Sequence, residues 1–101
     1  MPWIDVADRH RLTTRRWIEA QAGRVAIMLY DIDGTVHATS AICPHHAAFL
    51  SQGSFSGNTV DCPRHQGRFH IPTGALLRGP ACDSLRTYRT CVRDGRVLVE
   101  V

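Results

Sequence analysis

Long apolar runs, lysine and helical periodicity are all missing from this sequence of 101 residues. Without an apolar run of about twenty residues, no transmembrane helix is expected. The first ten residues carry Asp5 and Asp8 and no apolar stretch, so we expect no signal peptide. The sequence therefore predicts a single domain of ordinary size, located in the cytoplasm and making no contact with a membrane.

All twelve basic residues are arginine, and with nine acidic residues they give a formal net charge of +3. Basic side chains gather near the N-terminus, at Arg9, His10, Arg11, Arg15 and Arg16. Such a cluster can bind nucleic acid, but no aromatic stacking platform accompanies it. We therefore expect a solvated loop and strand face, balanced by Asp5, Asp8 and Glu19, and no nucleic-acid partner.

Short apolar runs separated by turns predict an all-β fold. Apolar residues recur over Val25–Tyr30, and Asp33-Gly34 predicts a hairpin turn into Thr35–Thr39. A second pair of this kind, Asp94-Gly95, joins the expected strands Leu85–Val92 and Arg96–Val101. Further strands are expected at Trp3–Val6, Arg16–Ala20, Gly53–Phe55, Thr59–Asp61 and Arg68–Ile71. No segment has the sustained period that would predict a helix.

The segment between these two hairpins, Ala41 to Cys82, is rich in glycine, proline, histidine and cysteine. Its strands must be short because turn residues interrupt them so often. We predict one domain over residues 1–101, in which residues 1–40 and 83–101 form an antiparallel sandwich or barrel. Residues 41–82 are expected to form a small β subdomain inserted into it.

Two runs in this segment, Cys43-Pro44-His45 and Cys62-Pro63-Arg64-His65, each supply one thiolate and one imidazole. Both runs follow the end of a stretch whose residues favour a strand, so both are expected on loops. A 2Fe–2S cluster with two cysteines on one iron and two histidines on the other uses this mixed donor set. Neutral imidazoles lower the negative charge of the centre, so it accepts an electron more readily than a four-cysteine cluster does. We interpret Cys43, His45, Cys62 and His65 as the ligands of one such cluster in an electron carrier.

Three other interpretations fit the same residues. A zinc-stabilised binding module would use the four ligands tetrahedrally, although structural zinc usually takes a cysteine pair from one turn and a histidine pair from another. A nucleophilic Cys–His enzyme would leave one pair unexplained. A chain with no metal would make the two matched pairs a coincidence. His46 directly follows His45, but the Cys-x-His spacing favours His45.

The two remaining cysteines, Cys82 and Cys91, are expected to be free thiols. A reducing compartment disfavours disulfides.

These residues resemble the Rieske family, whose motif is Cys-x-His followed at a distance by Cys-x-x-His. The likeness continues through Gly67-Arg68-Phe69, Thr73-Gly74 and Gly79-Pro80-Ala81-Cys82 to the last hairpin, Val92–Val99. Over nearly the whole chain the pattern is similar to ferredoxin components of bacterial aromatic-ring dioxygenases. It implies the Rieske β fold, with residues 77–82 as a loop that covers the cluster. Respiratory members add a cysteine to each cluster loop, whereas this chain has Ala48 and Arg64 there.

The resemblance implies a soluble carrier that takes single electrons from a ferredoxin reductase and passes them to a terminal oxygenase. The chain would perform no substrate chemistry itself. Arg64 and Arg68 flank the expected cluster end and could position an acidic partner surface. Within the family, the small Rieske-like subunit of a nitrite reductase is the alternative.

Overall fold

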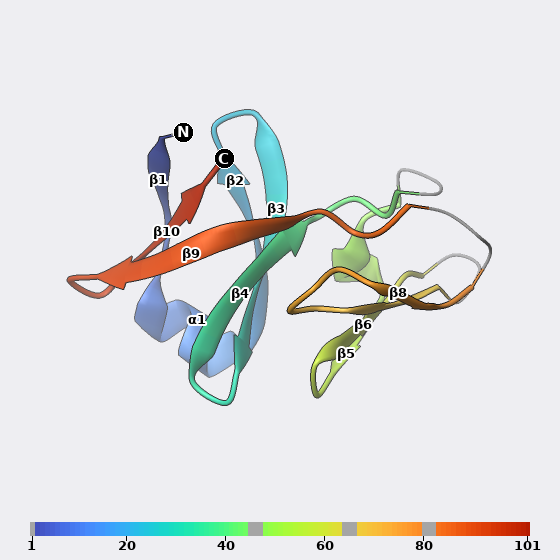
Figure 1. Ribbon diagram of the computed structural model, residues 1–101. Coiled ribbons are helices and arrows are strands. Elements are labelled where there is room, and N and C mark those ends of the chain that lie inside the picture. Colours follow the sequence, from blue (N-terminus) through green and yellow to red (C-terminus); the bar gives the residue numbers. More distant parts are fainter. Residues whose placement is uncertain (1, 45–47, 64–66, 80–82) are drawn as a thin grey trace.

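Two antiparallel sheets make up the computed structural model, which describes residues 2–44, 48–63, 67–79 and 83–101 (Figure 1). The larger sheet has six strands in the order β1-β10-β9-β4-β3-β2. Their bounds are β1 Trp3–Asp8, β2 Trp17–Ala22, β3 Val25–Ile32, β4 Thr35–Ser40, β9 Thr87–Arg93 and β10 Arg96–Glu100. The edge strands β1 and β2 lie against each other, so the sheet is nearly closed. The predicted all-β, barrel-like architecture is confirmed.

The smaller sheet contains four strands in the order β5-β6-β7-β8. Each has three residues: β5 Ser54–Ser56, β6 Thr59–Asp61, β7 Arg68–His70 and β8 Leu76–Arg78. A 3-10 helix, η1 (Leu50–Gln52), precedes β5. In Figure 1 this sheet stands to the right of the barrel, away from the marked N and C termini. Strand β8 was not expected, because the sequence pattern placed its residues partly in a covering loop.

Both Asp-Gly pairs form the predicted hairpin turns. Asp33 and Gly34 have φ angles of 51° and 85°, and Asp94 and Gly95 have 52° and 76°. Two successive positive φ angles are typical of the type I′ turn, whose twist matches that of the flanking strands. The first turn joins β3 to β4, and the second joins β9 to β10.

Strand β3 contributes to two hydrophobic cores. Ile27 and Leu29 belong to the core inside the barrel, whereas Met28 and Tyr30 belong to the core under the small sheet. Alternate residues of a strand point to opposite faces, so both faces of β3 are covered. The hydroxyl group of the buried Tyr30 lies 2.8 Å from that of Thr39, which satisfies both polar groups.

Three aromatic rings connect the two sheets. The ring of Phe55 on β5 lies 5.7 Å from that of Trp17 and 5.5 Å from that of Tyr30, measured between centroids. Ser51, on η1, donates a hydrogen bond of 2.9 Å to Glu19 on β2. The small sheet is therefore packed on the barrel through β2 and β3.

A short helix, α1 (Arg9–Arg15), corrects the prediction that the N-terminal basic cluster forms a loop and strand face. The carboxylate of Asp8 caps it by accepting a hydrogen bond from the His10 amide at 2.7 Å. With seven residues and one buried side chain, Leu12, the helix is too short to produce a recognisable period. The expected charge balance also differs, because Asp5 and Asp8 form ion pairs with Arg96.

Strand boundaries differ by one or two residues at several places. Strand β2 begins at Trp17 rather than Arg16, and β9 covers Thr87–Arg93 rather than Leu85–Val92. Leu85 is instead buried in the core under the small sheet. No helix within the described residues is long and apolar enough to cross a membrane.

Candidate metal centre

The loops that follow Cys43 and Cys62 are closed by the same backbone hydrogen bond. The backbone N–H of Cys43 donates to the carbonyl oxygen of Ala48 at 2.8 Å, and that of Cys62 donates to Gly67 at 2.7 Å. In both cases the acceptor is five residues after the cysteine. Each cysteine therefore stands at the base of a closed loop of equal length, and β6 leads directly into the second one.

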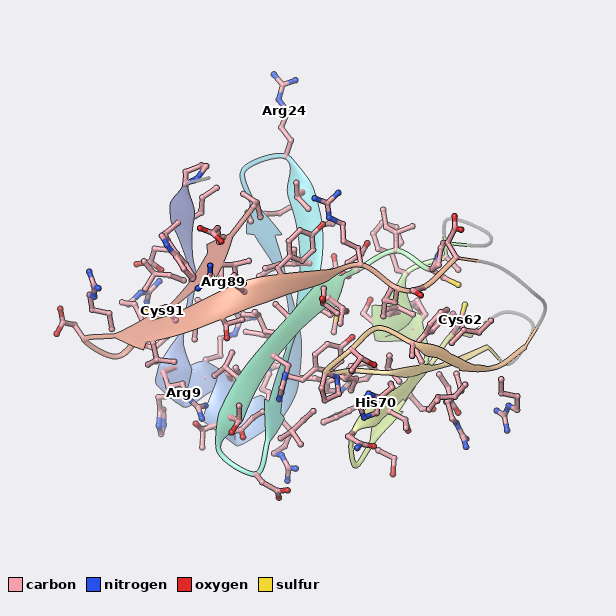
Figure 2. All side chains as sticks on the ribbon, viewed as in Figure 1. Arg9, Arg24, Cys62, His70, Arg89 and Cys91 are labelled. Atoms are coloured by element: carbon pink, nitrogen blue, oxygen red, sulfur yellow. The ribbon has the colours of Figure 1, made fainter. Side chains whose placement is uncertain are left out.

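Both cysteine side chains are withdrawn from solvent. Cys43 is 1% exposed and Cys62 is 3% exposed, and both belong to the core under the small sheet, with Val60 and Phe69. Figure 2 shows Cys62 toward the end of the small sheet that lies farther from the barrel. Such apolar surroundings exclude water from a bound metal centre and influence its reduction potential.

Gly79 allows two stretches of backbone to approach each other closely beside Cys62. A Cβ atom on Gly67 would lie 3.7 Å from the Cβ atom of Cys62, and one on Gly79 would lie 3.0 Å from the Cα atom of Gly67. Gly79 also has a φ of 124°, which other residues rarely adopt. Gly79, directly after β8, therefore packs backbone to backbone against Gly67, which closes the second cysteine loop. Buried thiolate donors within this close-packed frame fit a cluster that must be shielded from water.

The other two predicted ligands, His45 and His65, lie outside the described residues, as do His46 and Arg64. Their roles therefore remain predictions. Cys82 is also outside this part of the chain, whereas Cys91 on β9 is a free thiol, as expected. The structure thus describes one cysteine from each predicted pair and brings both into one core.

A row of charged residues crosses the small sheet in register: Asp61 on β6, Arg68 on β7 and Arg78 on β8. Arg68 donates two hydrogen bonds to the Asp61 carboxylate, at 2.7 and 3.1 Å. These bonds hold the pKa of Asp61 below its ordinary value. This pairing could not be predicted from the sequence, because it depends on the register of β6 and β7.

The fold and the two cysteine loops together define an antiparallel β protein in which a small sheet lies beside two loops that each carry a buried cysteine. A model of the Rieske [2Fe-2S] domain matches residues 2–89. The chain belongs to the Rieske family.

Individual relatives agree with this assignment. The ferredoxin component of the 2,4-dinitrotoluene dioxygenase system of Burkholderia sp. (strain RASC) is 35% identical over 99 residues, covering 98% of this chain and 95% of that relative. The ferredoxin of carbazole 1,9a-dioxygenase from Nocardioides aromaticivorans IC177 has a TM-score of 0.88 and 28% identity, with 98% and 97% of the two chains covered. A chain in the complex of reduced oxygenase and oxidized ferredoxin in carbazole 1,9a-dioxygenase has a TM-score of 0.85 and 26% identity, with coverage of 96% and 91%.

Proposed function

We propose that this protein carries single electrons from a ferredoxin reductase to the terminal oxygenase of an aromatic-ring dioxygenase system, through one Rieske 2Fe–2S cluster. The observation that carries the proposal is the pair of matching loops whose cysteines are buried in one core. The relatives named above are ferredoxin components and match almost end to end. The chain would act in the cytoplasm and would itself perform no substrate chemistry.

We assign the ligands as Cys43 and Cys62 on one iron and His45 and His65 on the other. When bound, the cluster supplies a reversible one-electron couple. The apolar core around the two cysteines would keep water away from the iron that they bind. Residues 41–82 would act as the cluster-binding subdomain, and residues 1–40 and 83–101 as its base.

The relatives favour the carrier over the nitrite reductase subunit, because they are ferredoxins of dioxygenase systems. Zinc is the alternative from another class, and it predicts a colourless protein with one zinc per chain and no sulfide.

The proposal is tested by metal and sulfide analysis of the purified protein, followed by electron delivery. We expect two irons and two sulfides per chain, a red-brown colour and a Rieske-type paramagnetic signal after reduction with dithionite. The reduced protein is then mixed with an oxidised terminal oxygenase, whose reduction is followed by its visible spectrum. Stoichiometric zinc, or an iron–sulfur protein that reduces no such oxygenase, would contradict the proposal.

A further inference from the structure

Positive charge is concentrated in the segment of the sequence that carries the two metal-binding runs. The segment 41–82 contains three arginines (Arg64, Arg68 and Arg78) against one aspartate (Asp61), whereas the rest of the chain contains nine arginines against eight acidic residues. The excess of +3 therefore comes mainly from the part of the chain that carries the cysteines. Charge of one sign beside a docking site steers partners of the opposite sign.

Arg78 is the arginine of this segment that the structure places best for docking. Arg68 occupies the Asp61 carboxylate with two short hydrogen bonds, whereas the Arg78 guanidinium is 3.8 Å from it and its side chain is 50% exposed. Both guanidinium groups share the single Asp61 carboxylate, so the three residues together carry a net positive charge. Arg78 stands at the outer end of this row, where half of its side chain is exposed.

Arg78 also lies close to the second cysteine loop. Its carbonyl oxygen is 3.8 Å from the position of a Cβ atom on Gly67, and the same position is 3.7 Å from the Cβ atom of Cys62. Only the glycine backbone therefore separates the Arg78 backbone from a predicted ligand. A partner that contacts the Arg78 side chain would dock within a short electron-transfer distance of the centre.

Exposed apolar residues are found both at the first cysteine loop and beside Arg78. Ile42 and Phe49 form a β-bridge at the neck of the first cysteine loop, and both are exposed. Leu77, beside Arg78, occupies the point where the register of β7 and β8 shifts, and it is 53% exposed. A β-bulge of this kind redirects a side chain away from the sheet. Apolar contacts with charged residues at the rim are the usual composition of a protein–protein interface.

We propose that the cysteine-bearing end of the protein docks onto a carboxylate-rich surface of the terminal oxygenase, with Arg78 as the principal cationic contact. This inference rests on the proposed function and adds the chemistry of the partner's surface. The contact orients the partner and raises the rate of encounter, so its effect depends on ionic strength.

The test measures oxidation of the dithionite-reduced holoprotein by two small complexes of opposite charge. Each molecule of hexacyanoferrate(III) or hexaammineruthenium(III) takes one electron from one reduced protein, and the rate is followed by stopped-flow absorbance. For the wild type, added salt should slow the reaction with the anion and speed the reaction with the cation. In Arg78→Glu the anion should react about 3- to 10-fold more slowly at low salt, and this difference should vanish at high salt.

Arg24→Glu is the matched control, because it changes the net charge by the same amount. Arg24 is exposed at the turn between β2 and β3, where Figure 2 shows it pointing away from the molecule and far from Cys62. Equal effects of the two substitutions would overturn the proposal. The proposal would also be overturned if the wild type formed a dimer that the Arg78→Glu substitution dissociates. That result would show that the surface binds a second copy of the chain instead.

The same variants are then compared with an oxidised terminal oxygenase as electron acceptor. The proposal expects Arg78→Glu to slow reduction at low salt and Arg24→Glu to leave it near the wild-type rate. A wild type that reduces no such oxygenase would contradict the proposed function. A wild type that reduces it at a rate independent of salt and of Arg78 would contradict the docking inference alone.

Discussion

Replacing Cys43 with serine is expected to give a protein with no stoichiometric iron or sulfide and no visible colour. A serine hydroxyl group is a far poorer iron ligand than a thiolate, and the 1% exposed position of Cys43 leaves no room for solvent to substitute. Unligated loops would also lose the stabilisation that metal binding contributes to folding. The measurements are iron and sulfide content, the visible spectrum and the paramagnetic signal after reduction.

Cys91→Ser is the control for this substitution. Cys91 lies on β9 in the barrel, with a free thiol that is partly buried. This variant should retain two irons, two sulfides and the wild-type spectrum. A Cys43→Ser protein that kept a full cluster, or a Cys91→Ser protein that lost it, would refute the ligand assignment.

The same measurements distinguish which of the two adjacent histidines, His45 or His46, binds the cluster. His45→Ala should lose the cluster, whereas His46→Ala should keep its iron content and spectrum, because the Cys-x-His spacing assigns His45 as the ligand. Cluster loss in His46→Ala with retention in His45→Ala would reverse that assignment. Both residues lie outside the described part of the structure, so this pair of variants decides a point that rests on the sequence.

Gly74→Ala is expected to lower the temperature at which the cluster's colour is lost by about 10 °C or more. Gly74 follows β7 with a φ of 77°, and a Cβ atom there would lie 2.0 Å from the Leu85 carbonyl oxygen. The left-handed conformation costs alanine about 1–2 kcal/mol, and relieving the overlap costs about 1–3 kcal/mol more. In a domain of this size, about 1 kcal/mol corresponds to about 4–8 °C.

Gly57→Ala separates these two costs. Gly57 lies in the turn between β5 and β6 with a φ of 59°, and a Cβ atom there would meet nothing within 4 Å. Only the conformational cost remains, so the shift should be about half as large or less. Equal shifts for the two variants would show that the contact with Leu85 contributes nothing.

The sequence predicted the parts of the fold that depend on local pattern. The two Asp-Gly turns and the strands beside them were predictable because the turn chemistry and the alternation of β3 and β4 agree. Helix α1 was not predictable in this way, since its evidence is one N-cap carboxylate and one buried leucine. Strand β8 was missed because Leu77 and Arg78 were assigned to the loop that covers the cluster, and a three-residue strand with an irregular register has no regular alternation that would have indicated otherwise.

For the site, spacing predicted which residues belong together but not what surrounds them. The burial of Cys43 and Cys62 in one core results from the packing of the small sheet against β3. The hydrogen bonds between Arg68 and Asp61 require the pairing of β6 with β7. The sequence indicated Arg64 and Arg68 as docking residues. Arg64 lies outside the described residues, and Arg68 is held by Asp61, so the docking proposal is built on Arg78 instead.

The position of β3 between two cores determines how cooperatively the protein unfolds. One side of this strand is lined by Ile27 and Leu29 and the other by Met28 and Tyr30. If either sheet unfolds, β3 loses the apolar contacts on one of its faces, and the other sheet packs against the same strand. The barrel and the small sheet should therefore melt in a single cooperative transition. A cavity created deep in the barrel, for example at Leu29, would thus shorten the lifetime of a cluster it never touches.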